Sequence, residues 1–229
     1  MTVAISEAGI PIIAADRRRE DFEEWQDNLP EVARNNVSFY PLDVTKEQQV
    51  DELAEVLNSR NISISYLINN AGIQGAAKPW EMTTKTWERV MRVNIDGTFY
   101  LTRAFSKAMT EAGFGRIVNI ASLFAYHPGR GQGPYAAGKA AITGYTRSVA
   151  LDLASSGVTV NAIAPGYIWH QRLADVFPEG TTPTFEEVPM KRSGKPEEIA
   201  ATVAFLISEG AGYITGQTIH VNGGLYLPG

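Results

Sequence analysis

The sequence has no cysteine among its 229 residues, which excludes disulfide bonds and thiol catalysis. Its three histidines, His127, His170 and His220, lack the spacing of metal ligands, so no metal site is expected. No apolar run reaches the roughly 18 residues that span a membrane, and the start is not typical of a signal peptide. Basic residues are outnumbered, and a net charge of −5 argues against a nucleic-acid partner. We therefore expect a cytoplasmic protein with no nucleic-acid or membrane partner.

Short apolar runs alternate with helical segments along the whole chain. Buried strands are expected at residues 10–15, 37–42, 62–68, 116–120, 159–164 and 217–221. The longest helix is expected at residues 84–112, with a kink near Asn94-Ile95-Asp96-Gly97, and Thr45-x-x-Gln48 predicts a capping box at another helix. This order predicts an α/β fold in one domain, residues 1–229, with a doubly wound parallel sheet and helices on both faces.

Three residues near the middle of the chain carry a recognisable chemistry. Ser122 follows the expected strand at 116–120, Tyr135 comes thirteen residues later, and Lys139 four residues after that. Pro134 suits the first turn of a helix, which places Tyr135 and Lys139 on one face, one turn apart. A lysine ammonium at this position is expected to lower the pKa of the tyrosine. The arrangement predicts a proton donor or acceptor and a hydroxyl that binds the same substrate oxygen.

An overlapping pattern, Gly133-x-x-x-x-Gly138-Lys139, is similar to a phosphate-binding loop. Ala140 stands where such a loop has Ser or Thr to hold magnesium, and no strand leads directly into it. The pattern therefore does not predict a nucleoside triphosphate site.

Other motifs occur in a consistent order around this group. They are Asn69-Asn70-Ala71-Gly72, Asn94, Ser122, Tyr135-x-x-x-Lys139, Asn161, Pro165-Gly166, Thr215-Gly216-Gln217 and Val221-Asn222-Gly223-Gly224. In this order the chain resembles the short-chain dehydrogenase/reductase family. The resemblance implies a Rossmann-like fold and an NAD(P)-dependent enzyme that interconverts a carbonyl and a secondary alcohol by hydride transfer.

The resemblance also implies a role for each catalytic candidate. Tyr135 would be the general acid in reduction and the base in oxidation, and Ser122 would polarise the substrate carbonyl. Lys139 would lower the pKa of Tyr135 and hold the ribose next to the nicotinamide. Asn94 would hold a water in a proton relay, although a plain helix kink explains it too.

The cofactor contacts are implied in the same way. Candidate cofactor-binding residues are Asp16, Arg17, Asp43, Val44, Asn70, Ala71, Gly72, Tyr135, Lys139, Pro165, Gly166 and Ile168. A carboxylate at Asp16 would bind ribose hydroxyls and repel a 2′-phosphate, which favours NAD, whereas Arg17 could pair with the phosphate of NADP. NAD is the favoured cofactor and NADP the alternative.

The chain departs from the family pattern at its start. The family opens with a strand and a Thr-Gly-x-x-x-Gly-x-Gly turn, and this chain begins within the helix that follows. The missing strand is normally central, so its neighbours are expected to carry unpaired backbone groups beside an apolar gap. Either the working protein starts upstream, or this is a truncated relative, and then a non-catalytic subunit or binding module becomes the alternative function.

The substrate and assembly are less sharply indicated. Residues 169–192 are expected to form a lid, and nearby aromatic residues such as Phe124 and Trp169 favour an apolar or aromatic carbonyl or alcohol. Reduction of a β-ketoacyl group and oxidation of a sugar or polyol both remain open. The resemblance implies a homotetramer, with a homodimer next, whose contacts would come from Tyr100, Phe105, Met109 and Tyr145.

Overall fold

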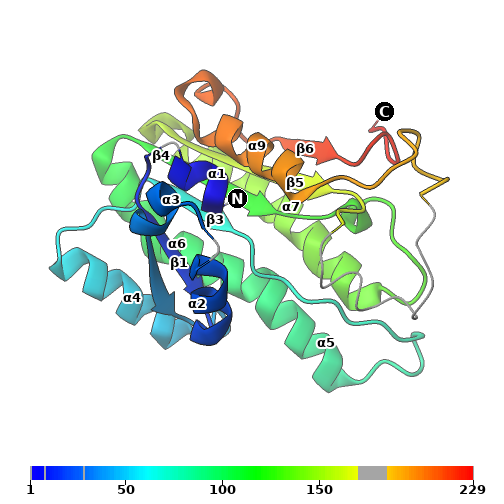
Figure 1. Ribbon diagram of the computed structural model, residues 1–229. Helices are drawn as coiled ribbons and strands as arrows, with labels where there is room; N and C mark the ends of the chain where they lie inside the picture. Colours follow the sequence, from blue (N-terminus) through cyan, green and yellow to red (C-terminus); the bar gives the residue numbers. More distant parts are fainter. Residues whose placement is uncertain (1, 8, 28, 170–184, 229) are drawn as a thin grey trace.

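Strands and helices alternate along the chain, as the sequence predicts (Figure 1). The computed structural model describes residues 2–7, 9–27, 29–169 and 185–228. The strands are β1 (Ile12–Asp16), β2 (Val37–Pro41), β3 (Tyr66–Asn69), β4 (Gly115–Ile120), β5 (Val158–Pro165) and β6 (Thr218–Val221). The helices are α1 (Thr2–Glu7), α2 (Arg19–Asp27), α3 (Glu31–Asn35), α4 (Glu47–Ser59), α5 (Thr84–Met91), α6 (Gly97–Ala112), α7 (Gly133–Leu153) and α9 (Pro196–Ile207). Shorter helical turns are η1 (Arg92–Asp96), η2 (Leu123–Ala125), η3 (Ala154–Ser156) and η4 (Glu209–Ala211).

Every strand pair among the described residues is parallel, but the strands form two separate groups. β1 pairs with β2, and the other group has the order β3-β4-β5-β6. In Figure 1 the two dark-blue strands of the first group lie apart from β4, β5 and β6. The parallel pairing and the helical crossovers confirm the predicted α/β class.

Helices cover both faces of these strands, so the arrangement is doubly wound. One hydrophobic core, which we call the α6-side core, contains Leu42, Val50, Leu53, Leu57, Leu67, Phe105, Met109, Ile117, Ala150, Val158 and Val160. The other, the α9-side core, contains Ile5, Val118, Ile120, Ile163, Ile199, Val203, Leu206 and Ile207. All of β4 is buried, as expected for a strand covered on both faces.

The break between the two strand groups falls where the sequence predicts a missing strand. β1 and β3 each have one hydrogen-bonded neighbour, whereas β4 and β5 each have two. The exposed fractions follow the pairing: β5 is buried over seven of its eight residues, but no residue of β1 is fully buried. We call the space between β1 and β3 the seam.

The long helical segment at residues 84–112 is interrupted where the sequence predicts a kink. α5 and α6 are joined by the π-helical turn η1, whose Asn94 is completely buried. Gly97 opens α6 directly against Val44, since a Cβ at Gly97 would lie 2.8 Å from Cγ2 of Val44. The turn therefore brings Asn94 into the protein interior and allows α6 to pack closely on the segment after β2.

Two local predictions are wrong. The capping box does not form, because the Thr45 hydroxyl donates to Oδ1 of Asp43 at 2.8 Å and α4 begins later, at Glu47. The strand expected at residues 62–68 is confined to β3. Its partner β4 begins at Gly115, and Tyr66 already lies opposite Arg116, so earlier residues have no strand to pair with.

Two residues expected at a subunit interface are also corrected. Phe105 and Met109 are 7% and 1% exposed and belong to the α6-side core of their own chain, so they are not surface contacts. Among the described helices, none is long and apolar enough to cross a bilayer.

Candidate functional site

The polar residues predicted to form the site follow the carboxyl ends of the strands. Asp16 is the last residue of β1, Asn70 directly follows β3, and Ser122 lies two residues after β4. Parallel strands within a sheet bring their carboxyl ends to one edge, which is where ligands bind in open α/β sheets. The predicted residues therefore collect at a single edge of each strand group.

Ser122 and Tyr135 are in direct contact. Ser122 has an extended backbone at the start of η2, where its Oγ accepts the Phe124 N–H at 3.2 Å. Tyr135 stands in the first turn of α7, after Pro134, and its hydroxyl is hydrogen-bonded to Ser122. The Phe124 ring packs edge-on against the Tyr135 ring, with centroids 6.1 Å apart. The two hydroxyls predicted to bind one substrate oxygen are thus side by side, next to an aromatic wall.

Lys139 is buried beneath this pair. Its side chain is only 3% exposed, and its Nζ donates to the carbonyl of Ile120, the last residue of β4, at 2.6 Å. The Nζ also lies 5.9 Å from the centroid of the Tyr135 ring. Burial lowers the pKa of Lys139 to about 8, because the charged form has little solvent.

The prediction that Lys139 lowers the pKa of Tyr135 is wrong for this structure. Burial raises the pKa of Tyr135, and the hydrogen bond from Ser122 offsets only part of that rise. Lys139 directs its Nζ to Ile120 instead of to the tyrosine hydroxyl. Tyr135 is therefore protonated at neutral pH, the form required of a general acid.

Asn94 fixes the loop that passes over Lys139. Its Oδ1 accepts the Ile73 N–H at 2.8 Å, and its Nδ2 donates to the Ile73 carbonyl at 3.0 Å. A Cβ at Gly72 would lie 3.0 Å from the Nζ of Lys139 and 3.3 Å from Oδ1 of Asn94. The loop after β3 thus lies directly against the lysine, and the predicted Asn70-Ala71-Gly72 segment reaches the site by its backbone.

Pro165, Gly166 and Ile168 lie at the end of β5 and in the loop that follows it. Pro165 is the last residue of β5, and the Gly166 N–H donates to the carbonyl of Val221 in β6 at 2.9 Å. A Cβ at Gly166 would come within 2.7 Å of Asn222, so the glycine allows a close backbone approach.

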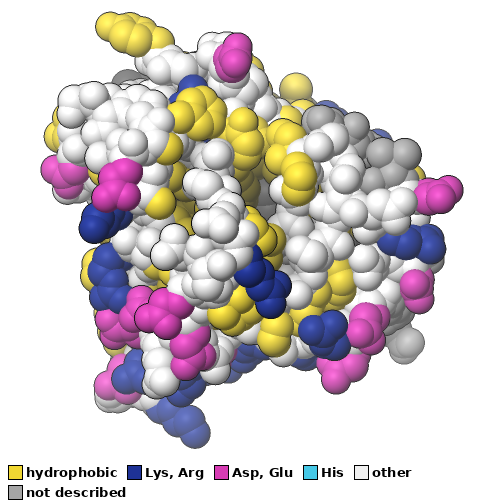
Figure 2. Space-filling model, turned by 90° about the vertical axis from the view of Figure 1, so that its left-hand side faces the viewer, with side chains coloured by type: hydrophobic (Ala, Val, Ile, Leu, Met, Phe, Trp, Pro, Cys, Tyr) yellow, Lys and Arg dark blue, Asp and Glu magenta, His cyan; other side chains and the backbone are white. Residues whose placement is uncertain are grey.

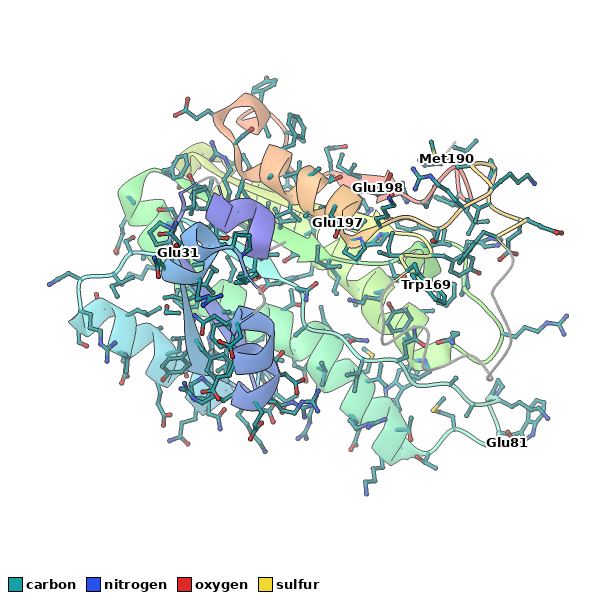
Figure 3. The ribbon with its side chains drawn as sticks, viewed as in Figure 1. Glu31, Glu81, Trp169, Met190, Glu197 and Glu198 are labelled. Atoms are coloured by element: carbon teal, nitrogen blue, oxygen red, sulfur yellow. The ribbon has the colours of Figure 1, made fainter. Side chains whose placement is uncertain are left out.

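Sequence reasoning missed the residue that supports this loop, Gly194. The Gly194 carbonyl accepts the Trp169 N–H at 2.9 Å, and a Cβ at Gly194 would lie 2.6 Å from Cδ1 of Ile168. Glu198 accepts two hydrogen bonds from Arg192 nearby, at 2.8 and 2.7 Å. Figure 3 shows Trp169, Glu198 and Met190 on the same side of the molecule, toward the end at which β6 finishes. The Gly194-Lys195-Pro196 sequence before α9 was the available signal.

The residues predicted at the adenosine end lie on the other strand group. Asp16 is exposed, and its Oδ1 accepts the Arg17 N–H at 2.6 Å, so the carboxylate caps the turn after β1. Arg17 is exposed as well. Asp43 is held by hydrogen bonds from Thr45, and the Val44 side chain packs against Gly97 of α6. Most of the predicted lid, residues 170–184 with His170, lies outside the described residues.

A tyrosine acid beside a serine hydroxyl and a buried lysine, at the carboxyl edge of a parallel sheet, is a site for proton transfer at a substrate oxygen. Residues 1–226 match the family model described as enoyl-(acyl carrier protein) reductase. The chain therefore belongs to the short-chain dehydrogenase/reductase family of NAD(P)-dependent oxidoreductases.

Several named proteins are similar over almost the whole chain. The 3-oxoacyl-[acyl-carrier-protein] reductase FabG of Buchnera aphidicola is 35% identical over 227 residues, covering 99% of this chain and 91% of that protein. FabG of Vibrio cholerae is 39% identical over 97% of this chain and 90% of its own length. Among solved structures, a proposed gluconate dehydrogenase from Agrobacterium tumefaciens is 30% identical, with a TM-score of 0.92 over 100% of this chain and 91% of its own. ElxO with NADP bound is 28% identical, with a TM-score of 0.90 over 98% and 92% of the two chains.

The described residues fit one half of a nicotinamide dinucleotide well. Gly72 leaves open the space above Lys139 that a side chain would fill. The dinucleotide's pyrophosphate has less support, because the sequence contains no Thr-Gly-x-x-x-Gly-x-Gly turn.

Replacing Gly72 by Ala tests this geometry. The new methyl group would meet Lys139 and Asn94, so we expect NADPH affinity to fall at least about tenfold with little change in melting temperature. Fluorescence titration with NADPH measures the affinity. Gly144→Ala in α7 is the matched control, since its Cβ would meet nothing within 4 Å. Equal NADPH affinity in the two variants would contradict the packing described here.

Proposed function

We propose that this protein reduces the keto group of a 3-oxoacyl thioester to a hydroxyl, with a nicotinamide dinucleotide as the reductant. The observation that carries the proposal is the buried Tyr135 hydroxyl, protonated at neutral pH and hydrogen-bonded to Ser122. The relatives from Buchnera aphidicola and Vibrio cholerae, both named 3-oxoacyl-[acyl-carrier-protein] reductases, support the choice of substrate.

The side chains divide the work as follows. Ser122 binds the substrate carbonyl oxygen, and Tyr135 donates its proton to the same oxygen as the C=O electron pair moves onto it. The carbonyl carbon gains its hydrogen from the reduced nicotinamide, which supplies a hydride when bound. Phe124 walls the site beside Tyr135, which limits the approach of water. The overall reaction balances, because one hydride added to the carbonyl carbon and one proton added to its oxygen convert the neutral ketone to the neutral alcohol.

Several residues would hold the dinucleotide. Lys139 lies against Gly72 and would bind the ribose hydroxyls there, and Ile168 would contact the carboxamide through its backbone. Asp43 and Val44 would lie at the adenine. Asn94 supports this end indirectly, because both of its side-chain polar atoms are already bonded to Ile73.

The assembly is proposed to be a homotetramer or homodimer. Phe99 in α6 is 40% exposed and contacts the rings of Tyr100 and Tyr145, so an aromatic surface joins α6 and α7. This surface replaces the predicted contribution of Phe105 and Met109. Sedimentation of a clean monomer at micromolar concentration would contradict it.

Tyr135→Phe tests the mechanism. The variant lacks only the acidic hydroxyl, so we expect turnover of a 3-oxoacyl thioester to fall by about 10²- to 10⁴-fold while the melting temperature barely changes. Consumption of NADPH measures the rate. Tyr145→Phe, on the same helix, is the matched control and keeps its rate. A near-normal rate in Tyr135→Phe would exclude the tyrosine as the acid.

The substrate class is tested with the unmodified protein. With a 3-oxoacyl thioester, we expect the protein to oxidise NADPH or NADH. With gluconate, we expect no reduction of NADP or NAD. Activity with gluconate alone would instead favour sugar-acid oxidation, the reaction in the name of the Agrobacterium tumefaciens neighbour. A folded protein that binds neither dinucleotide would support the non-catalytic alternative.

Cofactor preference rests on Asp16 and Arg17, both exposed at the end of β1. Asp16 is proposed to favour NAD by binding its ribose hydroxyls, although the structural relative ElxO was solved with NADP. We expect Asp16→Ala to shift the ratio of NADH to NADPH affinity toward NADPH by about tenfold, and Arg17→Ala to shift it the other way. An unchanged affinity ratio in both variants would show that neither residue distinguishes a 2′-hydroxyl from a 2′-phosphate on the adenosine ribose.

A further inference from the structure

Three aromatic rings from distant parts of the sequence pack together around Tyr126, four residues after Ser122. The rings belong to Tyr126, His220 and Tyr226, and we call them the ring cluster. The Tyr126 and Tyr226 rings are stacked, with centroids 5.4 Å apart and planes inclined by 27°. The His220 ring meets Tyr126 edge-on at 4.7 Å and lies 5.1 Å from the Tyr226 ring. The ring cluster therefore joins the turn η2, strand β6 and the segment that follows β6.

Tyr126 closes the short turn η2, which begins at Ser122. The Tyr126 N–H donates to the Leu123 carbonyl at 2.9 Å, so Tyr126 takes part in the hydrogen bonding of the turn. In the same turn the Phe124 N–H donates to Oγ of Ser122 at 3.2 Å. Because that N–H fills an acceptor position of Oγ, the Ser122 hydroxyl is left to donate to Tyr135. The direction of the Ser122 hydroxyl therefore depends on where the turn is held.

Packing holds this turn at both of its ends. Leu123, at the start of the turn, is 2% exposed, so its side chain anchors that end in the interior. Tyr126, at the other end, is half-buried, and its ring packs on those of His220 and Tyr226. Aromatic pairs in such arrangements attract each other beyond the effect of the area that they bury. The ring cluster therefore holds the Tyr126 end of the turn.

Two consecutive glycines turn the chain after β6, drawn in red in Figure 1, so that Tyr226 reaches this position. Gly223 and Gly224 have φ angles of 64° and 87°, in the left-handed region that side chains disfavour. Asn222 holds the turn closed, because its Oδ1 accepts the Gly224 N–H at 3.0 Å and its Nδ2 donates to the Tyr226 carbonyl at 2.9 Å. The Val221-Asn222-Gly223-Gly224 sequence thus brings the Tyr226 ring back onto the turn that follows β4.

We propose that Tyr226 is a positioning residue for the reaction, because its ring, stacked on Tyr126, fixes the turn that orients the Ser122 hydroxyl. The proposal rests on the reductase function proposed above and adds to it a residue far from Ser122 in the sequence. Tyr226 acts through Tyr126 and has no part in the proton transfer itself. Small displacements matter at such a site, since about 1 Å at a reacting group costs up to about 10²-fold in rate.

Amide hydrogen exchange followed by NMR tests this link without any turnover. Tyr226→Leu keeps an apolar side chain and removes the ring. We expect exchange at the Phe124 and Tyr126 amides to become at least about tenfold faster in this variant, because both N–H groups are bonded within the turn. Amides of α4 are the internal control and stay unchanged. That helix lies at the left of Figure 1, on the side turned toward the viewer in Figure 2.

Three further variants separate the effect of the ring from other effects. Tyr226→Phe keeps the stacked ring, so we expect it to exchange as the unmodified protein does. Leu227→Ala changes the next residue, which is 78% exposed, and is expected to alter neither exchange nor rate. Tyr126→Leu removes the same stacked pair from its other side and gives a second measurement at the Phe124 amide, which we also expect to exchange faster. Thermal unfolding confirms that each variant folds.

Kinetics in two backgrounds separate positioning from a general loss of structure. In the unmodified background, we expect Tyr226→Leu to lower kcat for a 3-oxoacyl thioester at least about tenfold, with the KM for NADPH changed less than about twofold. In a Ser122→Ala background, the same substitution is expected to cost less than about twofold further, because the hydroxyl that Tyr226 positions is already absent. A merely structural effect would lower the rate by the same factor in both backgrounds.

Three results would overturn the proposal: unchanged exchange at the Phe124 amide in Tyr226→Leu, equally fast exchange in Tyr226→Phe or Leu227→Ala, or equal rate losses in the two backgrounds. A protein that turns over no 3-oxoacyl thioester would contradict the proposed reductase function instead. The exchange measurements need no turnover, so they would still decide whether the Tyr226 ring holds the turn at Ser122.

Discussion

The site depends on one buried interaction, the hydrogen bond from the Lys139 ammonium to the carbonyl of Ile120. It joins α7 to the end of β4, and it holds a cation where solvent is almost absent. Gly72 has no side chain because the lysine occupies that space, and Asn94 fixes the adjoining loop from the far side. Tyr135 stands above it, and burial raises the pKa of its hydroxyl further above neutral pH. The chemistry proposed for the site therefore follows from how tightly α7 packs on the sheet.

A second constraint is that the two halves of the proposed cofactor site lie on different strand groups. Asp16 and Arg17 follow β1, whereas Lys139 and Gly72 are built around β3, β4 and α7. Between them lies the seam, where neither strand edge is paired with the other. A dinucleotide that contacts both sets of residues would have to extend across the seam.

Much of this could be predicted from sequence, because the signals were local. Pro134 and the Tyr135-to-Lys139 spacing predicted the helix face, and the polar run around Asn94 predicted the break between α5 and α6. The predictions that were wrong depend on hydrogen-bond partners and burial, which residue type alone does not reveal. The Ile120 carbonyl captures Lys139, and burial reverses the expected pKa shift of Tyr135, which depends on packing alone. Thr45 had a competing acceptor in Asp43, two residues away, so its capping box did not form.

The central claim, that Lys139 is a buried amine held by a neutral carbonyl, is tested most directly by its own titration. NMR of the ¹³Cε resonances of labelled lysines, with Lys139 assigned by its loss in Lys139→Met, would follow each amine against pH. The account predicts a midpoint for Lys139 at a pH of about 8, charged below it and neutral above it, while exposed lysines titrate higher. A Lys139 midpoint at the ordinary lysine value of 10.5 would show a solvated amine and contradict the account.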